Sequence, residues 1–314
     1  MYSKVRITGL LAVTGWLLSL LGCKPRLDVG LVLLSLSSHT TQTSDVLLME
    51  TARAKLSRLC GSPESLIPQC IAAQGHQSNG PFLIFKGPQP PTDLGLYFSR
   101  KKGVVDSVVS GQSGGVISGG SVSYSGNLVL FTQSSHDRPA SFALWMWDAR
   151  SRKTALIPTV CFADGGSISS PYFNTDESAI LFICYKRNLT GGLKTRLVRY
   201  NVTNMEEETL LGGDPVVSAV YSSIKAQEIA AWSRNGLEII GPHRRDIIVK
   251  SDFAVNKIIP ANNISWSGDG LYLLFCLQHE QDTILYAVDI DTKIVTTVRT
   301  FPKTRLITLN GLIS

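Results

Sequence analysis

Short apolar runs alternate with polar turns along most of the chain, and the same order of runs recurs. The three clearest copies begin near residues 121, 170 and 263. Each copy reads as a strand, a polar turn, a strand that ends in Phe, a loop, a strand that ends in Asp or Asn, and a fourth strand after a further turn. Short apolar runs bounded by Ser, Gly, Asn and Asp are typical of strands. The pattern therefore predicts a repeated unit of four short strands.

Two weaker copies begin near residues 82 and 218, and the residue that ends each second strand gives the period. These residues lie 46, 51, 50 and 43 positions apart: Phe85, Phe131, Phe182, Trp232 and Phe275. One such sheet cannot bury its faces alone, whereas stacking the sheets around an axis buries the faces between neighbours. A β-sandwich is the alternative, but its strands recur without a longer period. The repeat therefore predicts an all-β chain, a β-propeller of five to six four-stranded blades.

Two of the copies resemble the repeat of TolB-type β-propellers, in which Ser-x-Asp-Gly precedes an apolar strand. Residues 264–275 read Ile-Ser-Trp-Ser-Gly-Asp-Gly-Leu-Tyr-Leu-Leu-Phe, and residues 171–182 read Pro-Tyr-Phe-Asn-Thr-Asp-Glu-Ser-Ala-Ile-Leu-Phe. The resemblance extends over about residues 80–300 and implies six blades behind a separate α/β domain. Gly268 stands where the family usually has Pro, and Asn127 replaces the Asp of the motif. The resemblance therefore favours an architecture and assigns no activity.

Residues 23–79 precede the repeats and are expected to form a linker or cap with one helix. Residues 28–36 read as a strand, and Ser44 is a suitable N-cap for a helix that runs to Leu59. The apolar face of that helix would carry Val46, Leu47, Met49, Ala52, Leu56 and Leu59. The segment is too short for the α/β domain of the family, so it is expected to cap the propeller or to complete a sixth blade. The expected division is a leader over 1–22, this segment over 23–79 and the propeller over 80–314.

The first residues have the pattern of a signal peptide. Lys4 and Arg6 precede an uncharged, Leu-rich stretch over residues 7–22, which is shorter than the roughly 20 residues of a membrane-spanning helix. Leu-Leu-Gly-Cys at residues 20–23 resembles the lipobox of bacterial lipoproteins, which implies cleavage before Cys23 and attachment of diacylglycerol and a further acyl chain, such as palmitate, to that residue. Such acyl chains hold a protein on a membrane surface. An ordinary signal peptide that contains a cysteine is the alternative.

The address that this resemblance implies is the bacterial cell envelope, with the protein facing the periplasm. Lys24 follows the cysteine in place of the Asp associated with inner-membrane retention, which favours the outer membrane. Lys and Arg exceed Asp and Glu by six in the 314 residues, and removal of Lys4 and Arg6 leaves +4. The excess is spread along the chain, so no nucleic-acid partner is expected. A membrane, through Cys23, and a protein of the envelope are the expected partners.

The cysteines offer one candidate disulfide. Cys60 and Cys70 bracket a nine-residue loop that a disulfide would close in an oxidising compartment. Cys184 and Cys276 end apolar strands at corresponding positions of the repeat, and packing alone explains them. The five histidines have no partner at the spacing of a zinc site. We therefore expect no metal and no cofactor.

Two groups of residues resemble catalytic motifs and are better explained by structure. Ser113 lies in a Gly-x-Ser-x-Gly pattern, but the sequence that follows is not the helix that a nucleophile elbow requires. Asp148, Asn201 and Asp289 recur at one position of the repeat, where side-chain oxygens usually accept hydrogen bonds from turn N–H groups. No catalytic residue is therefore assigned. The preferred hypothesis is a lipid-anchored, non-catalytic protein-binding scaffold, and the alternative is an envelope hydrolase or lyase with its site at the mouth of the propeller channel.

Overall fold

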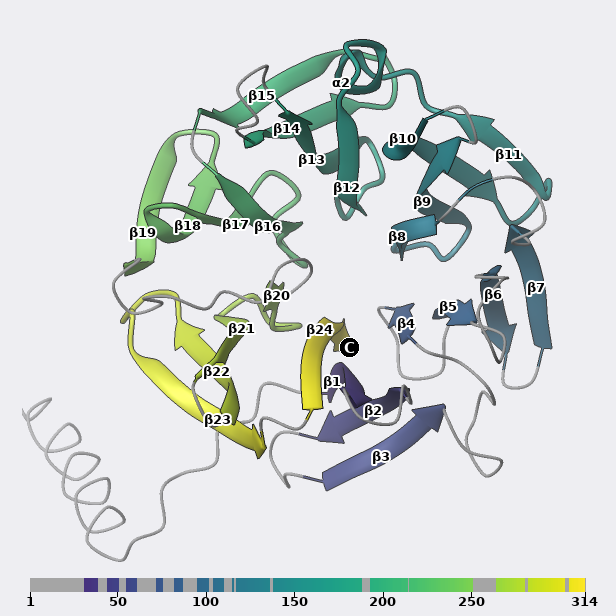
Figure 1. The fold of residues 1–314 in the computed structure, drawn as a ribbon. Coiled ribbons are helices and arrows are strands. Elements are labelled where there is room, and N and C mark those ends of the chain that lie inside the picture. The colour runs from purple at the N-terminus through teal and green to yellow at the C-terminus, as the bar shows by residue number, and fades with distance from the viewer. Residues whose placement is uncertain are drawn as a thin grey trace, which may run out of the picture.

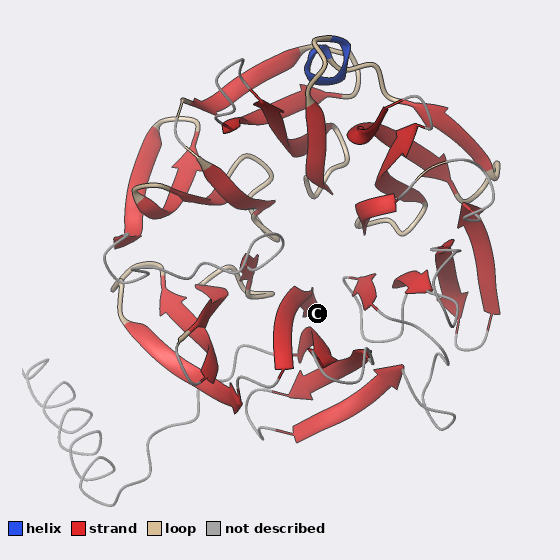
Figure 2. Cartoon of the chain, in the orientation of Figure 1, coloured by secondary structure: helices blue, strands red, loops and turns tan. Residues whose placement is uncertain are grey.

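The computed structural model describes residues 31–38, 44–50, 55–60, 72–75, 82–86, 95–101, 104–109, 115, 117–135, 138–187, 193–213, 215–250, 264–279, 282–302 and 305–313. The strands of these residues form six four-stranded antiparallel sheets, arranged as blades around one axis (Figure 1). Figure 2 shows one short helix among them. The fold is a six-bladed β-propeller, within the five to six blades that the repeat predicts.

Five blades use strands that are consecutive in the sequence. The first comprises β4 (Ala72–Gly75), β5 (Phe82–Lys86), β6 (Gly95–Lys101) and β7 (Val104–Val109). The second comprises β8 (Ile117–Val122), β9 (Leu128–Ser135), β10 (Arg138–Asp148) and β11 (Lys153–Leu156). The third follows the helix α2 (Val160–Ala163) and comprises β12 (Ser167–Phe173), β13 (Ala179–Arg187), β14 (Leu193–Asn201) and β15 (Glu207–Gly212). The fourth comprises β16 (Val216–Tyr221), β17 (Ile229–Ser233), β18 (Gly236–Gly241) and β19 (Arg244–Lys250), and the fifth β20 (Ile264–Trp266), β21 (Tyr272–Gln278), β22 (Asp282–Asp289) and β23 (Val295–Pro302).

The sixth blade closes the ring with strands from both ends of the described chain. Its order is β24 (Arg305–Ile313), β1 (Leu31–Ser38), β2 (Ser44–Glu50) and β3 (Lys55–Cys60). β24 pairs antiparallel with β1, from Leu31 opposite Ile313 to Ser38 opposite Arg305. The innermost strands of neighbouring blades contact one another all round the ring, in the order β24, β4, β8, β12, β16, β20 and back to β24. The segment before the repeats thus completes a blade.

The prediction of a helix from Ser44 to Leu59 is wrong. β2 and β3 occupy this segment and pair with each other, with Glu50 opposite Lys55. The apolar residues of the segment fit a helical face locally, but β1 offers β2 an edge along its whole length, from Leu31 opposite Glu50 to Ser37 opposite Ser44. Tertiary pairing of this kind overrides local helix propensity. The boundary expected at residue 80 falls between β4 and β5, which belong to one sheet.

The hydrophobic core lies between neighbouring blades. The four largest fully buried side chains belong to the second strands β9, β13, β17 and β21: Phe131, Phe182, Trp232 and Phe275. They are four of the five residues that set the period of the repeat. The rings of Trp232 and Phe275 come from adjacent blades, and their centroids lie 5.3 Å apart. The prediction that stacking buries the blade faces is therefore confirmed.

The recurring Asp or Asn residues cap the turn after the third strand of their blades. Asp148 accepts hydrogen bonds from the N–H groups of Arg150 and Ser151. Asn201 accepts from the N–H groups of residues 203 and 204, and Asp289 from those of residues 291 and 292. These bonds lower the pKa of Asp148 and of Asp289. The three side chains serve the turns, as the sequence predicts.

Candidate binding site between two blades

The strands nearest the axis carry almost no charge. β8, β12, β16 and β20 read Ile-Ser-Gly-Gly-Ser-Val, Ser-Ile-Ser-Ser-Pro-Tyr-Phe, Val-Val-Ser-Ala-Val-Tyr and Ile-Ser-Trp. A Cβ atom added to Gly119 would meet no atom within 4 Å, so this part of β8 borders open space. These four inner strands therefore carry no charged side chain. Of the other two inner strands, β4 contains Gln74, and β24 contains Arg305, Thr308 and Asn310.

Charged side chains gather instead in a cleft between the third and fourth blades. The antiparallel order brings the turns at 174–178, 202–206 and 222–228 to the same end of the propeller. They border a cleft of about 600 Å³, which is within the usual size range of ligand sites. Its lining comprises Asn174, Asp176, Ser178, Ala179, Arg199, Asn201, Asn204, Glu206, Glu207, Glu208, Tyr221, Ala226 and Gln227. Four carboxylates and one guanidinium thus face one hollow, which we call the acidic cleft.

The local folding of the third blade fixes two of these carboxylates. Oδ1 of Asp176 accepts hydrogen bonds from the hydroxyl and the N–H group of Ser178, and these bonds hold the pKa of Asp176 below its usual value. Oε2 of Glu206 accepts a bond of 2.6 Å from the amide of Asn204. Both side chains are exposed. Asp176 is therefore ionised at neutral pH in a turn that holds it in place.

The other two carboxylates stand on β15. Glu208 forms an ion pair with Arg199 of β14 across the strand pair. Oε1 of Glu207 accepts a bond of 2.7 Å from the N–H group of Val160, the first residue of α2. Burial raises the pKa of Glu207, while this bond and the charge of Arg196 act in the opposite direction. One carboxylate of the cleft is therefore neutralised by a neighbour, and another is tied to the helix.

The hydroxyl group of Tyr221 is an unsatisfied polar group at this site. The side chain is 2% exposed and ends β16, on the fourth-blade side of the cleft. Its oxygen is buried and has no hydrogen-bond partner among the atoms that the structure describes. Burial raises the pKa of Tyr221 well above its usual range, and the charges of Arg199, Glu208 and Asp176 also act on it. Buried polar groups without a partner are rare in folded proteins and require an explanation.

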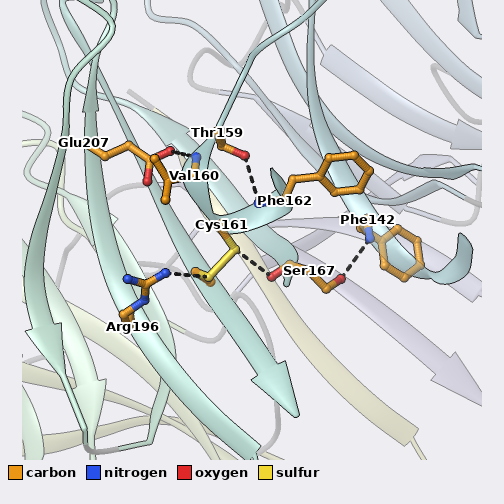
Figure 3. Close-up of a disulfide and its surroundings, with 9 residues drawn as sticks. Phe142, Thr159, Val160, Cys161, Phe162, Ser167, Arg196 and Glu207 are labelled. Carbon is orange, nitrogen blue, oxygen red and sulfur yellow. Dashed lines mark hydrogen bonds between the residues drawn. A yellow bond between two sulfur atoms is a disulfide. The ribbon is translucent and has the colours of Figure 1, made fainter. Parts of the chain in front are cut away.

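A disulfide joins α2 to the third blade, beside the acidic cleft (Figure 3). It links Cys161 with Cys184 of β13, whose Cα atoms lie 5.9 Å apart, and both residues are buried. Thr159 caps the helix by accepting a bond from the N–H group of Phe162, and a guanidinium nitrogen of Arg196 lies 3.7 Å from Sγ of Cys184. Structural disulfides persist in oxidising compartments such as the bacterial periplasm.

This disulfide corrects the interpretation of Cys184 as a packing residue alone. The spacing of the cysteines does not point to this pair, because Cys161 lies in a helix of four residues that the strand pattern does not reveal. Cys276, at the corresponding position of a later blade, is a buried free thiol, so packing does explain that residue.

The other residues singled out in the sequence are only partly described. Cys23, Cys70 and Ser113 lie outside the described residues, and Cys60 is described only as the last residue of β3. Gly115, which ends the Gly-x-Ser-x-Gly pattern, does lie within them. A Cβ atom there would stand 1.8 Å from the carbonyl oxygen of Ser134, so this position requires glycine for a close backbone approach.

Metal-binding clusters and membrane-spanning helices are both absent from the described residues. No group of three or more His, Cys, Asp or Glu side chains in them is arranged to hold a metal ion. No helix in the same residues combines the length and the apolar character needed to cross a membrane.

Solved structures share this architecture at low sequence identity. TolB from Acinetobacter baumannii matches with a TM-score of 0.65 and 13% identity, over 98% of this chain and 73% of that one. The β-propeller domain of the Trilobed protease from Pyrococcus furiosus, which has an open velcro topology, matches with a TM-score of 0.53 and 10% identity, over 84% and 78%. An oligogalacturonate lyase in complex with manganese matches with a TM-score of 0.52 and 13% identity, over 87% and 73%.

The similarity to these solved structures shows the β-propeller fold of this chain. At these identities it carries no residue role from one protein to another, and the three structures differ in what they do. The ring of this chain is closed by the pairing of β24 with β1. No protein-family model and no curated protein matches the chain.

Proposed function

We propose that this chain is a lipid-anchored protein of the bacterial envelope whose propeller binds a partner protein without catalysing a reaction. The observation that carries the proposal is the acidic cleft, where four carboxylates surround a hollow of about 600 Å³ bordered by a buried, unsatisfied tyrosine hydroxyl.

The proposed location rests on Cys23 and on the described disulfide. A cysteine at the end of an uncharged leader is the position at which lipoproteins are acylated, and Cys161–Cys184 is compatible with an oxidising compartment. Labelling of cells with radioactive palmitate tests the anchor. The label should appear on the protein and be absent from a Cys23→Ala variant, and globomycin should cause the unprocessed form to accumulate. A labelled Cys23→Ala variant would refute acylation at this residue.

The binding role is tested by capture from cross-linked envelopes, followed by reconstitution with the purified partner. We expect one specific protein whose affinity for the propeller can be measured by calorimetry. The alternative, an envelope hydrolase or lyase, predicts turnover of a substrate instead. Absence of a specific partner together with measurable turnover would overturn the proposed function.

A further inference from the structure

The acidic cleft has a charge opposite to that of the chain as a whole. Lys and Arg exceed Asp and Glu by six in the sequence, yet the lining of this cleft carries four carboxylates against one guanidinium. In the described residues, no Lys or Arg forms an ion pair with Asp176, Glu206 or Glu207. We infer that the acidic cleft binds a lysine or arginine side chain of a partner polypeptide. This inference rests on the proposed binding function and names its chemistry.

The groups around the cleft are matched to a cationic donor. Carboxylates accept hydrogen bonds, and an ammonium or guanidinium group offers several N–H donors, which makes such bonds stronger than neutral ones. Asp176 is held ionised by Ser178, and Glu206 is held by Asn204, so two acceptors are in place before a ligand arrives. A cation bound between them would meet fixed negative charge.

Tyr221 gives the independent indication that a ligand belongs here. Its phenolic oxygen is buried beside the charges of Arg199, Glu208 and Asp176 and has no partner in the described structure. A phenol oxygen accepts a bond from an ammonium or guanidinium group, so a cation that reaches this oxygen from the cleft would satisfy it. The acidic side chains and the orphan hydroxyl therefore require the same kind of ligand.

An apolar side chain beside the cleft favours a polypeptide over a free amine. Met205 is 66% exposed in the turn that also supplies Asn204 and Glu206. A peptide segment presents apolar side chains next to its cation, whereas a polyamine does not. The partner segment should therefore combine a Lys or Arg with an apolar neighbour.

The test measures binding of a fluorescein-labelled peptide of alternating Lys and Leu to the purified mature protein by fluorescence anisotropy. We expect saturable binding that weakens in 0.5 M NaCl, because salt screens exposed charges. The same peptide with Glu in place of Lys should not bind. Absence of binding by the Lys-Leu peptide would overturn the inference.

Variants then locate the peptide. Glu206→Gln should weaken binding by about 2- to 5-fold, the range of exposed ion pairs. Asp291→Asn, which removes the same charge from an exposed turn of the fifth blade, should leave the affinity unchanged. The combination of Asp176→Asn, Glu206→Gln and Glu207→Gln should weaken binding by about 10-fold or more. Equal effects of Glu206→Gln and Asp291→Asn would show that the peptide responds only to the net charge of the protein, and would refute the acidic cleft as its binding site.

Tyr221→Phe separates ligand binding from a purely structural role. It should weaken peptide binding by about 5-fold, the loss of one hydrogen bond, without lowering the melting temperature of the free protein. A lower melting temperature with unchanged peptide affinity would contradict the role given to the hydroxyl. Spermidine should compete poorly, and spermidine that binds as tightly as the peptide would assign the cleft to polyamines instead.

The failure of this inference is distinguishable from failure of the proposed function. If the envelope partner binds the triple variant as it binds the unmodified protein, the cleft is not its docking site, while the scaffold role stands. If the peptide binds at the cleft but no envelope partner exists and turnover is found, the scaffold role falls instead.

Discussion

Reduction of the Cys161–Cys184 disulfide should destabilise the propeller by about 3 kcal/mol. The two cysteines are 23 residues apart, and the loop between them contains the second half of α2 and all of β12. Closing a loop of this length removes about 3 kcal/mol of conformational entropy from the unfolded chain at 25 °C. β12 is the innermost strand of its blade and contacts β8 and β16, so the loop also holds part of the ring.

Urea unfolding followed by tryptophan fluorescence measures this effect. Trp147, Trp232 and Trp266 are buried and report on three blades. Unfolding curves of the oxidised and reduced protein should differ by about 1 M in midpoint, for a slope of about 3 kcal/mol per M. Because a disulfide between Cys60 and Cys70, which the sequence predicts, would also respond to reductant, the matched control is a Cys161→Ala/Cys184→Ala variant.

The difference between the two proteins isolates this disulfide. The double variant should begin at lower stability and lose about 3 kcal/mol less on reduction than the unmodified protein. If both proteins respond to reductant equally, the bond between Cys161 and Cys184 does not stabilise the fold, and the reasoning is refuted.

Three further predictions concern the core and its titratable groups. Phe182→Ala should lower the free energy of unfolding by about 3–5 kcal/mol, because the ring is fully buried between blades. Leu193→Ala, at a side chain that is 60% exposed, should change it by less than about 0.5 kcal/mol. Equal effects of the two substitutions in urea unfolding would contradict the blade-stacking core. Arg245→Met should cost about 2–3 kcal/mol at neutral pH, because Glu238 is 0% exposed and accepts a bond of 2.5 Å from that arginine. Burial alone would raise the pKa of Glu238, but its bonds from Arg245 and Ser233 lower it below the usual 4.5. The stabilisation is therefore fully present above pH 4.5 and is lost as the pH falls through the lowered pKa. A cost of Arg245→Met that stays constant as the pH is lowered through the acid range would contradict the assignment. Burial raises the pKa of the Cys276 thiol to about 12. Iodoacetamide should therefore alkylate this thiol only after unfolding, which mass spectrometry detects. Alkylation of the native protein would show that the thiol is accessible.

The sequence predicts the parts of the fold that depend on local pattern. Phe131, Phe182, Trp232 and Phe275 mark the second strands of four blades because each of these blades buries one large side chain at that point. The Asp and Asn caps are likewise local, since a side-chain oxygen reaches N–H groups only two or three residues away.

Features of the fold that depend on contacts between residues far apart in the chain cannot be predicted from local sequence pattern. β24 and β1 lie almost the whole length of the chain apart, and only their pairing makes residues 44–50 and 55–60 into strands of a sixth blade. The Cys161–Cys184 disulfide requires knowledge of where α2 packs.

The acidic cleft is hidden from sequence for a similar reason. Asp176, Glu206 and Glu208 come from separate turns and a strand of one blade, and Tyr221 comes from the next blade. Their charges look scattered along the chain, as acidic residues on a solvated surface do. Only the antiparallel order of the strands brings them to one end of the propeller.

Site-specific photo-cross-linking in cells that produce the protein tests the central claim, that the propeller binds a partner protein through the acidic cleft. Benzoylphenylalanine replaces Gln227, which lines the cleft, or Asp291, which lies in an exposed turn of the fifth blade. We predict one discrete cross-linked protein from position 227, none from position 291, and loss of the product when Glu206→Gln and Glu207→Gln are added. Absence of a product at position 227, or the same products from both positions, would contradict the account.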